Sequence, residues 1–400
     1  MKRFVWCSVI SLLCFGSSAE ISNLVTIDAD TDLSRSEENQ IETDNRFDKV
    51  ARKISGIYSE KETSLKVKKY SEFIKSSWNK LYMDSLSYIP DWTKKNLEEY
   101  TKKYDTLFYP FGGPDVSYST TFFPDAKRYI LVGLEPLGSF DQIEKSLKNP
   151  EYYDAVQVAF STYLKKGYFV TSEMQTQLSK NSNTKGGLNL ILLALPKLGF
   201  SIKEIENCSI DAGGNIVKSD PNGINCLKIV CEKDSKKKEI YYIRANLQNE
   251  NSKLDNLFKF VNKFEFSTFV KSASYALHDS RNFSKIRSFI LNETNCILQD
   301  DTGVPFNFFR QNWDIHIFGT YTEPTLPVFH AYKQNSLREY YLNHKAEPIT
   351  FPIGYGYIKR TPNLIFVVSL KKIVERQLNK LKEKLDKKKC SCYKRESELR

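Results

Sequence analysis

The spacing of apolar residues predicts a chain of alternating helices and strands. Across residues 58–103, large apolar side chains recur at steps of three and four, the period of an amphipathic helix; they are Tyr70, Phe73, Ile74, Trp78, Leu81 and Tyr82. Residues 106–111 and 128–134 are apolar runs of strand length, separated by a turn and a short helix. Further strands are expected at 201–206, 226–231, 239–245, 265–270, 313–321 and 364–370. Further helices are expected at 139–147, 151–166, 172–179, 188–198, 251–264, 283–291 and 337–343.

This alternation is typical of the α/β class with a mixed sheet. We expect one α/β domain over residues 105–370, flanked by a helical extension at 51–104 and by a basic C-terminal segment at 371–400. The composition agrees with a globular chain, because 40% of the residues are hydrophobic and 27% are charged. It excludes collagen-like and wholly disordered proteins.

The first nineteen residues have the three parts of a secretory signal peptide. Met1-Lys2-Arg3 is a basic start, residues 4–15 are mostly apolar, and Ser17 and Ala19 are the small residues of a cleavage site. Residues 20–50 carry nine acidic and three basic side chains, so an acidic, disordered leader is expected there. No later apolar run approaches the length of a membrane span. The sequence therefore predicts an exported, soluble protein, periplasmic or extracellular.

Charge is concentrated at the C-terminus. The whole chain has a net charge of +11, and residues 371–400 contain twelve basic and five acidic side chains. Within 371–389, apolar residues at steps of four, three and four predict an amphipathic helix; they are Val374, Leu378, Leu381 and Leu385. Two interpretations stay open, a basic helix lying on an anionic membrane surface and a solvated terminal helix. No specific nucleic-acid-binding motif accompanies the positive charge.

Cysteine usage is compatible with disulfides in an exported protein. The mature chain would keep six cysteines: Cys208, Cys226, Cys231, Cys296, Cys390 and Cys392. Six cysteines allow fifteen pairings. The expected hairpin favours Cys208 with Cys226, whereas Cys226 and Cys231 lie too far apart along one extended strand to bridge. The alternative is that most of them are buried or free thiols.

A glycine turn offers the first candidate site. Gly112 and Gly113 let a ligand approach the backbone, and the helix after Asp115 would point free N–H groups at it. Glu135 follows the next strand, 23 residues after Gly112. An acid at about this distance accepts ribose hydroxyls in dinucleotide-binding folds. Gly112, Gly113, Asp115 and Glu135 are therefore the candidate cofactor-binding residues.

The phrase YPFGGPD…RYILVGLEP resembles the first motif pair of S-adenosylmethionine-dependent methyltransferases and other Rossmann-like domains. The resemblance covers about thirty residues and implies a Rossmann-like mixed sheet with flanking helices and a transferase-like site. The sequence departs from the pattern because it has no G-x-G, and because Asp115 follows the turn instead of preceding it. Export also disfavours a nucleotide cosubstrate, so the cofactor stays unknown.

A second cluster contains groups suited to acid–base or hydrolase-like chemistry. Its candidate catalytic residues are Lys271, His278, Asp300 and Asp301. The alternative is a loop histidine and an ordinary turn at residues 300–303. No hydrolase or phosphate-loop motif is present, and the four dispersed histidines show no metal-ligand spacing, so no metal site is predicted.

Longer segments resemble an uncharacterised family of bacterial exported proteins. They are YPFGGPD, FFPDAKRYILVGLEPLG, KSASYALH, FSKIRSFIL, ILQDDTGVPF and WDIHIFGTY, and they extend from about residue 105 to residue 357. The resemblance implies a single family domain and supplies no activity. We therefore expect an exported protein that binds a small molecule or a protein partner. The alternative is an enzyme, transferase-like at Gly112–Glu135 or hydrolase-like around Lys271, His278 and Asp301.

Overall fold

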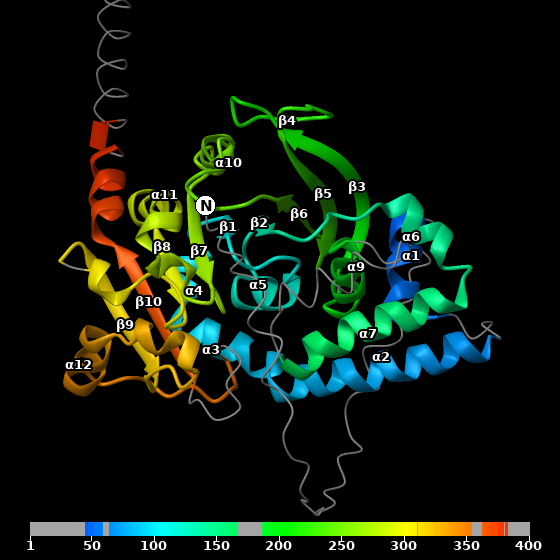
Figure 1. The fold of residues 1–400 in the computed structure, drawn as a ribbon, viewed down its shortest axis with the longest axis horizontal. Coiled ribbons are helices and arrows are strands. Elements are labelled where there is room, and N and C mark those ends of the chain that lie inside the picture. The colour runs from blue at the N-terminus through cyan, green and yellow to red at the C-terminus, as the bar shows by residue number, and fades with distance from the viewer. Residues whose placement is uncertain are drawn as a thin grey trace, which may run out of the picture.

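A ten-stranded mixed sheet organises the part of the chain that the structure describes (Figure 1). The computed structural model describes residues 45–58, 64–166, 186–309, 311–353, 362–379 and 381–382. The strand order is β4-β3-β5-β6-β2-β1-β7-β8-β10-β9. Five neighbouring strands at its centre are parallel: β6 (Lys236–Arg244), β2 (Arg128–Gly133), β1 (Thr106–Tyr109), β7 (Phe266–Val270) and β8 (Cys296–Gln299).

Antiparallel strands extend the sheet on both sides. Beyond β6 lie β5 (Ile224–Lys233), β3 (Ser201–Ile210) and the short β4 (Ile216–Val217). Beyond β8, the last strand β10 (Asn363–Ser369) is inserted between β8 and β9 (Trp313–Gly319) and pairs antiparallel to both.

Successive side chains of the central strands alternate between two buried cores, because side chains point to opposite faces of a sheet. In β2, Tyr129 and Leu131 belong to one core, whereas Ile130 and Val132 belong to the other. The first core is covered by α1 (Arg46–Ile54), α2 (Leu65–Asp84), α3 (Ile89–Asn96), α4 (Glu98–Thr101), α5 (Val116–Phe122), α6 (Phe140–Ser146), α7 (Pro150–Lys166) and α9 (Leu188–Lys197). The second is covered by α10 (Leu254–Val261), α11 (Ser280–Glu293) and α12 (Asn335–Asn343). The parallel part of the sheet is therefore buried on both sides, as parallel sheets are.

The N-terminal helices share the first core with the sheet. Ile54 of α1, Ile74 of α2 and Trp92 of α3 are buried in it together with Leu107 of β1. Helices α2 and α7 lie side by side (Figure 1). Helix α1 begins at Arg46, inside the range that the acidic composition assigns to a disordered leader. It forms because Asn45 caps it and because Val50, Ala51 and Ile54 bury one face.

The predicted strands before residue 271 are present, with β3 longer than expected, and so are β9 and β10. Strand β8 was not predicted, because four buried residues followed by a turn carry too little pattern to separate a strand from a loop. The predicted helix at 172–179, the signal peptide and the tail beyond residue 382 lie outside the described residues. Among the described helices, none combines the length and apolarity needed to cross a bilayer.

Candidate functional site

Both sequence-predicted clusters lie at the carboxyl edge of the parallel strands. Gly112 and Gly113 follow β1, Glu135 follows β2, Lys271 follows β7 directly, and Asp300 follows β8 directly. Since parallel strands end at the same edge of a sheet, residues far apart in the chain meet there.

The carboxyl group of Glu135 is folded into the glycine turn. Its side chain is only 2% exposed. A Cβ on Gly133 would lie 2.4 Å from Glu135 Oε2, and one on Gly113 would lie 3.3 Å from the same oxygen. Gly113 also has a φ of +55°, a conformation that favours glycine. The glycines therefore make room for this carboxyl group.

Glu135 sits in an environment that favours its neutral form. Burial raises the pKa of its carboxyl group. Glu135 Oε2 and the nearby Tyr242 hydroxyl are both buried, and their proximity opposes the rise in the pKa of Glu135 and adds to the rise in the pKa of Tyr242 that burial causes. Tyr242 packs against Gly187, where a Cβ would lie 2.4 Å from the hydroxyl oxygen. The acid expected to accept a ribose is thus enclosed by protein.

Lys271 lies in a buried electrostatic cluster with Asp115 and Asp300. The three side chains are between 1% and 3% exposed. The Lys271 ammonium lies 4.2 Å from the ring centre of Tyr118. Burial lowers the pKa of Lys271, and the two carboxylates oppose that shift. Burial likewise raises the pKa of Asp115, while the charge of Lys271 opposes it. Each charge therefore depends on the others in a poorly solvated place.

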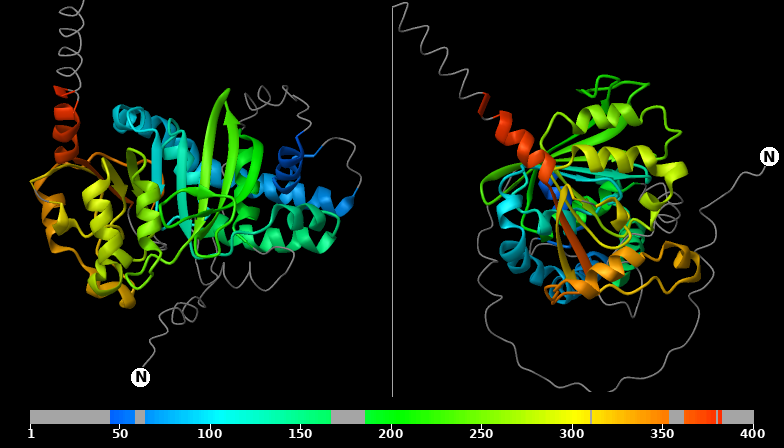
Figure 2. Two further views of the ribbon diagram at one scale, coloured as in Figure 1. Left: turned by 90° about the horizontal axis from the view of Figure 1, so that it is seen from above. Right: turned by 90° about the vertical axis from the view of Figure 1, so that its left-hand side faces the viewer.

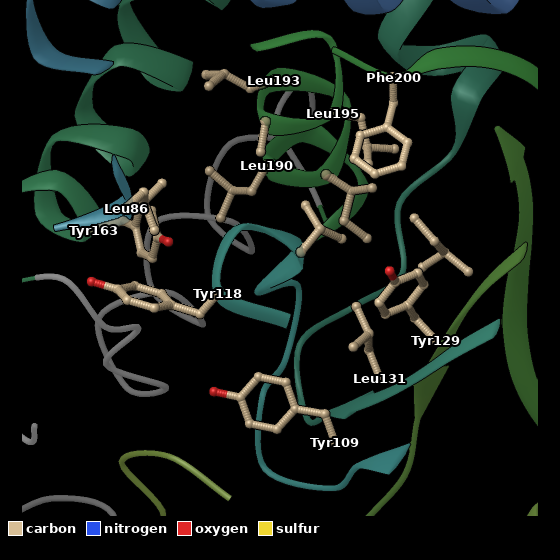
Figure 3. Close-up of a cluster of buried hydrophobic side chains, with 14 of the residues drawn as sticks. Leu86, Tyr109, Tyr118, Tyr129, Leu131, Tyr163, Leu190, Leu193, Leu195 and Phe200 are labelled. Atoms are coloured by element: carbon tan, nitrogen blue, oxygen red, sulfur yellow. The ribbon is translucent and has the colours of Figure 1, made fainter. Parts of the chain in front are cut away.

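Asp115 has a structural role at the start of α5. Its side chain accepts a hydrogen bond from the backbone N–H of Tyr118 at 3.2 Å, which caps the helix. The hydroxyl groups of Tyr109 and Tyr163 also donate to it, each at 3.3 Å. Figure 3 shows these three tyrosines in one buried cluster, with Tyr163 beside Tyr118. Tyrosine side chains therefore surround the carboxylate of Asp115, which the sequence predicts to lie next to a ligand.

Asp300 organises the loop after β8. Its carboxylate accepts hydrogen bonds from the backbone N–H of Ser272 at 2.8 Å and from that of Thr302 at 3.0 Å. The Thr302 hydroxyl donates to it as well. Burial and the neighbouring Asp301 raise the pKa of Asp300 to about 6.

Asp301 and His278 belong to a separate group at the same edge. Asp301 accepts hydrogen bonds from the Tyr275 hydroxyl at 2.7 Å and from the Asn363 amide at 3.1 Å. His278 packs edge-on against the Tyr275 ring, 5.2 Å between centres. Burial, as the largest cause, lowers the pKa of His278 to about 4. The four candidate catalytic residues therefore share an edge, but Lys271 and His278 have different partners.

The loop between Lys271 and His278 is strained. Ser272, Ser274 and Tyr275 have φ values of +56°, +51° and +58°, which side chains other than glycine adopt at a cost of roughly 1 kcal/mol each. Strain of this kind is held by surrounding contacts and clusters at functional sites.

Tyr109, Tyr118, Tyr163 and Asn363 also contribute to the carboxyl edge of the sheet. The sequence pattern does not distinguish them, because buried tyrosines and a strand-initial asparagine resemble core residues.

Comparison with known proteins does not identify a function for this site. No protein-family model, no curated protein and no solved structure matches the chain. Among the described residues, no set of three His, Cys, Asp or Glu side chains is grouped to hold a metal ion. Surface hollows of about 550 and 390 Å³ lie away from the carboxyl edge, the first beside Gly213 and Phe258 and the second beside Asn295 and Arg376.

The C-terminal helix, residues 370–379, projects from the body of the molecule (Figure 2). Arg376 anchors its inner side through Tyr104 at 3.1 Å and through Glu265, and Ile373 packs against the first core. On another side, Val374, Leu378 and Leu381 are 51–57% exposed. With 100° per residue, these three lie within one narrow face, roughly opposite Arg376. We call them the exposed apolar stripe.

Proposed function

We propose that the protein is an exported binding protein with a Rossmann-like scaffold, and that it binds its partner through its surface instead of through a cofactor. The strand order supports the scaffold. Numbered along the chain, the five parallel strands stand in the order 3-2-1-4-5, as in the dinucleotide-binding folds.

The observation that carries the proposal is the closure of the carboxyl edge. In open α/β sheets, ligands bind outside the carboxyl ends of the strands, where the strand order reverses. Here that place is between β1 and β7, and it holds Lys271, Asp115 and Asp300. Glu135 fills the adjoining glycine turn.

Entry of a nucleotide would be costly for two reasons. A phosphate at the turn would meet the carboxyl groups of Asp115 and Glu135. Displacing the Lys271 ammonium would leave two carboxylates in a dry interior, and breaking a buried ion pair costs about 3–5 kcal/mol. We therefore assign the scaffold the role of positioning surfaces that bind a partner. The exposed apolar stripe is one such surface.

A second candidate function is an enzyme that uses the strained loop. The left-handed residues Ser272, Ser274 and Tyr275 favour it, because they hold the loop between Lys271 and His278 in one conformation. This enzyme would bind its substrate at the carboxyl edge, whereas the proposed binding protein would not use that edge.

Thermal unfolding in the presence of nucleotide ligands tests whether the carboxyl edge is closed. The full chain and its Glu135→Gln variant are heated with 1 mM S-adenosylmethionine, NAD or ATP. A ligand at one hundred times its dissociation constant adds about 2.7 kcal/mol, which raises the midpoint by several degrees. We expect no rise. A rise that Glu135→Gln abolishes would refute closure of the edge and favour the enzyme.

A further inference from the structure

Two cysteines face each other across neighbouring strands. Cys208 of β3 and Cys226 of β5 are directly opposite in the antiparallel register. Their sulfur atoms are 2.8 Å apart. The residues are 7% and 1% exposed, and both belong to the second core. The two thiols therefore form an isolated, buried pair.

The strand register is compatible with a disulfide. Directly opposite residues of antiparallel strands have Cα atoms about 4.5–5.5 Å apart, inside the range of about 4.4–6.8 Å that disulfides span. The sulfur atoms would need to approach by roughly 0.8 Å to reach the bond length of about 2.05 Å.

The other described cysteines are excluded as partners. Cys231 is five residues after Cys226, so its side chain points to the opposite face of β5, into the first core. Its register neighbours are Ile202 and Lys238. Cys296 is buried in β8, which four strands separate from β5.

We propose that Cys208 and Cys226 form an intrachain disulfide when the protein folds with a disulfide oxidant such as oxidised glutathione. One cysteine thiolate attacks the oxidised glutathione and releases a glutathione thiolate, which leaves a mixed disulfide. The second cysteine thiolate attacks the protein sulfur of that bond and releases the second glutathione. Two cysteine thiols are oxidised, one glutathione disulfide is reduced to two thiols, and the two protons pass to glutathione.

In the folded structure, the hydrogen bond between the two thiols lowers the pKa of Cys208 and raises that of Cys226. Because both side chains are buried once the sheet is complete, the exchange belongs to folding. The bond would close a loop that contains β4 and would fasten the edge of the sheet to β5. It stands apart from the proposed function, since it needs neither partner nor ligand.

Peptide mapping of the full chain tests the pairing directly. The protein is folded with reduced and oxidised glutathione, its free thiols are alkylated in denaturant, and it is cleaved after Lys and Arg. The cleavage separates the three cysteines of this region, with Cys208 in residues 204–218, Cys226 in residues 219–228 and Cys231 in residues 229–233. We expect the first two peptides linked, with a mass two hydrogens below their sum, and the third alkylated.

Two outcomes would overturn the proposal. One is recovery of peptides 204–218 and 219–228 in alkylated form after oxidative folding. The other is a link from either of them to a different cysteine. A reductant should lower the unfolding midpoint of the oxidised protein by several degrees and should leave that of the double variant Cys208→Ala/Cys226→Ala unchanged. Cys296→Ala is the matched control, because it removes a buried thiol and should keep the response to reductant.

Discussion

Replacing Lys271 by Met tests whether the carboxyl edge is held by a buried electrostatic cluster. Met keeps most of the volume and removes the charge. Asp115 and Asp300 are then left in the interior without the ammonium that stabilises their charged forms. Since removing one partner of a buried pair costs about 3–5 kcal/mol, the free energy of unfolding at pH 7.5 should fall by about that amount.

Acid should restore much of that stability. The folded-state pKa of Asp300 is about 6, above its ordinary value of 3.8, so the folded protein binds this proton more readily than the unfolded chain does. Between pH 6 and pH 4, protonation therefore favours folding, and stability from this group decreases as pH rises. Without Lys271 both carboxyl groups gain more from protonation. The loss caused by Lys271→Met should shrink to below about 2 kcal/mol at pH 5.

Urea unfolding of the wild type and the variant at pH 7.5 and pH 5 measures this difference. Lys238→Met is the matched control, because Lys238 is also buried but donates to the carbonyl oxygens of Pro124 and Ala126. Its loss should be about 1–3 kcal/mol at both pH values. An equal loss of stability from Lys271→Met at pH 7.5 and pH 5, within about 0.5 kcal/mol, would refute the buried electrostatic cluster.

Four other measurements test separate parts of the chain. The pKa of His278 is lowered from 6.5 to about 4, so the folded protein should lose up to about 3 kcal/mol of unfolding free energy as pH falls from 6.5 to 4. In unfolding measurements, His278→Phe should make stability less dependent on pH across this range. Gly133→Ala should cost about 2 kcal/mol or more, since its Cβ would meet Glu135, and Glu135→Ala should restore part of the loss in thermal melts. Leu378→Asp should change stability by less than about 0.5 kcal/mol but weaken sedimentation with anionic vesicles, and equal sedimentation would remove the membrane interpretation. N-terminal sequencing of the protein secreted by bacteria should begin at Glu20, and an uncleaved Met1 would contradict the signal peptide.

Secondary structure could be predicted from the sequence because it depends on residues that are close together in the chain. The three- and four-residue spacing around Ile74 and Trp78 predicts a helix that buries one face, and α2 buries both residues. The strands on either side of Gly113 could be predicted because their apolar runs end at turn residues. The pairing of Cys208 with Cys226 was favoured for the same reason, since a hairpin brings the two segments together.

The candidate site could be predicted only in part. Glycines followed by an acid after the next strand indicate a turn beside a carboxylate, and the structure has that arrangement at Gly113 and Glu135. The sequence pattern does not predict where the Glu135 side chain points. That direction depends on its packing against Gly133. Lys271 lies 156 positions from Asp115, and no local pattern joins them. Their meeting depends on the placement of β7 beside β1.

The sequence by itself determined where most of the helices and strands form and which face of each is apolar, because those properties repeat over a few residues. Only the tertiary structure decided the rest. It made residues 296–299 a strand, inserted β10 between β8 and β9, and enclosed Lys271 with two carboxyl groups. The physical reason is that strand order and burial depend on contacts across the whole chain, where every segment competes for the same two faces of one sheet.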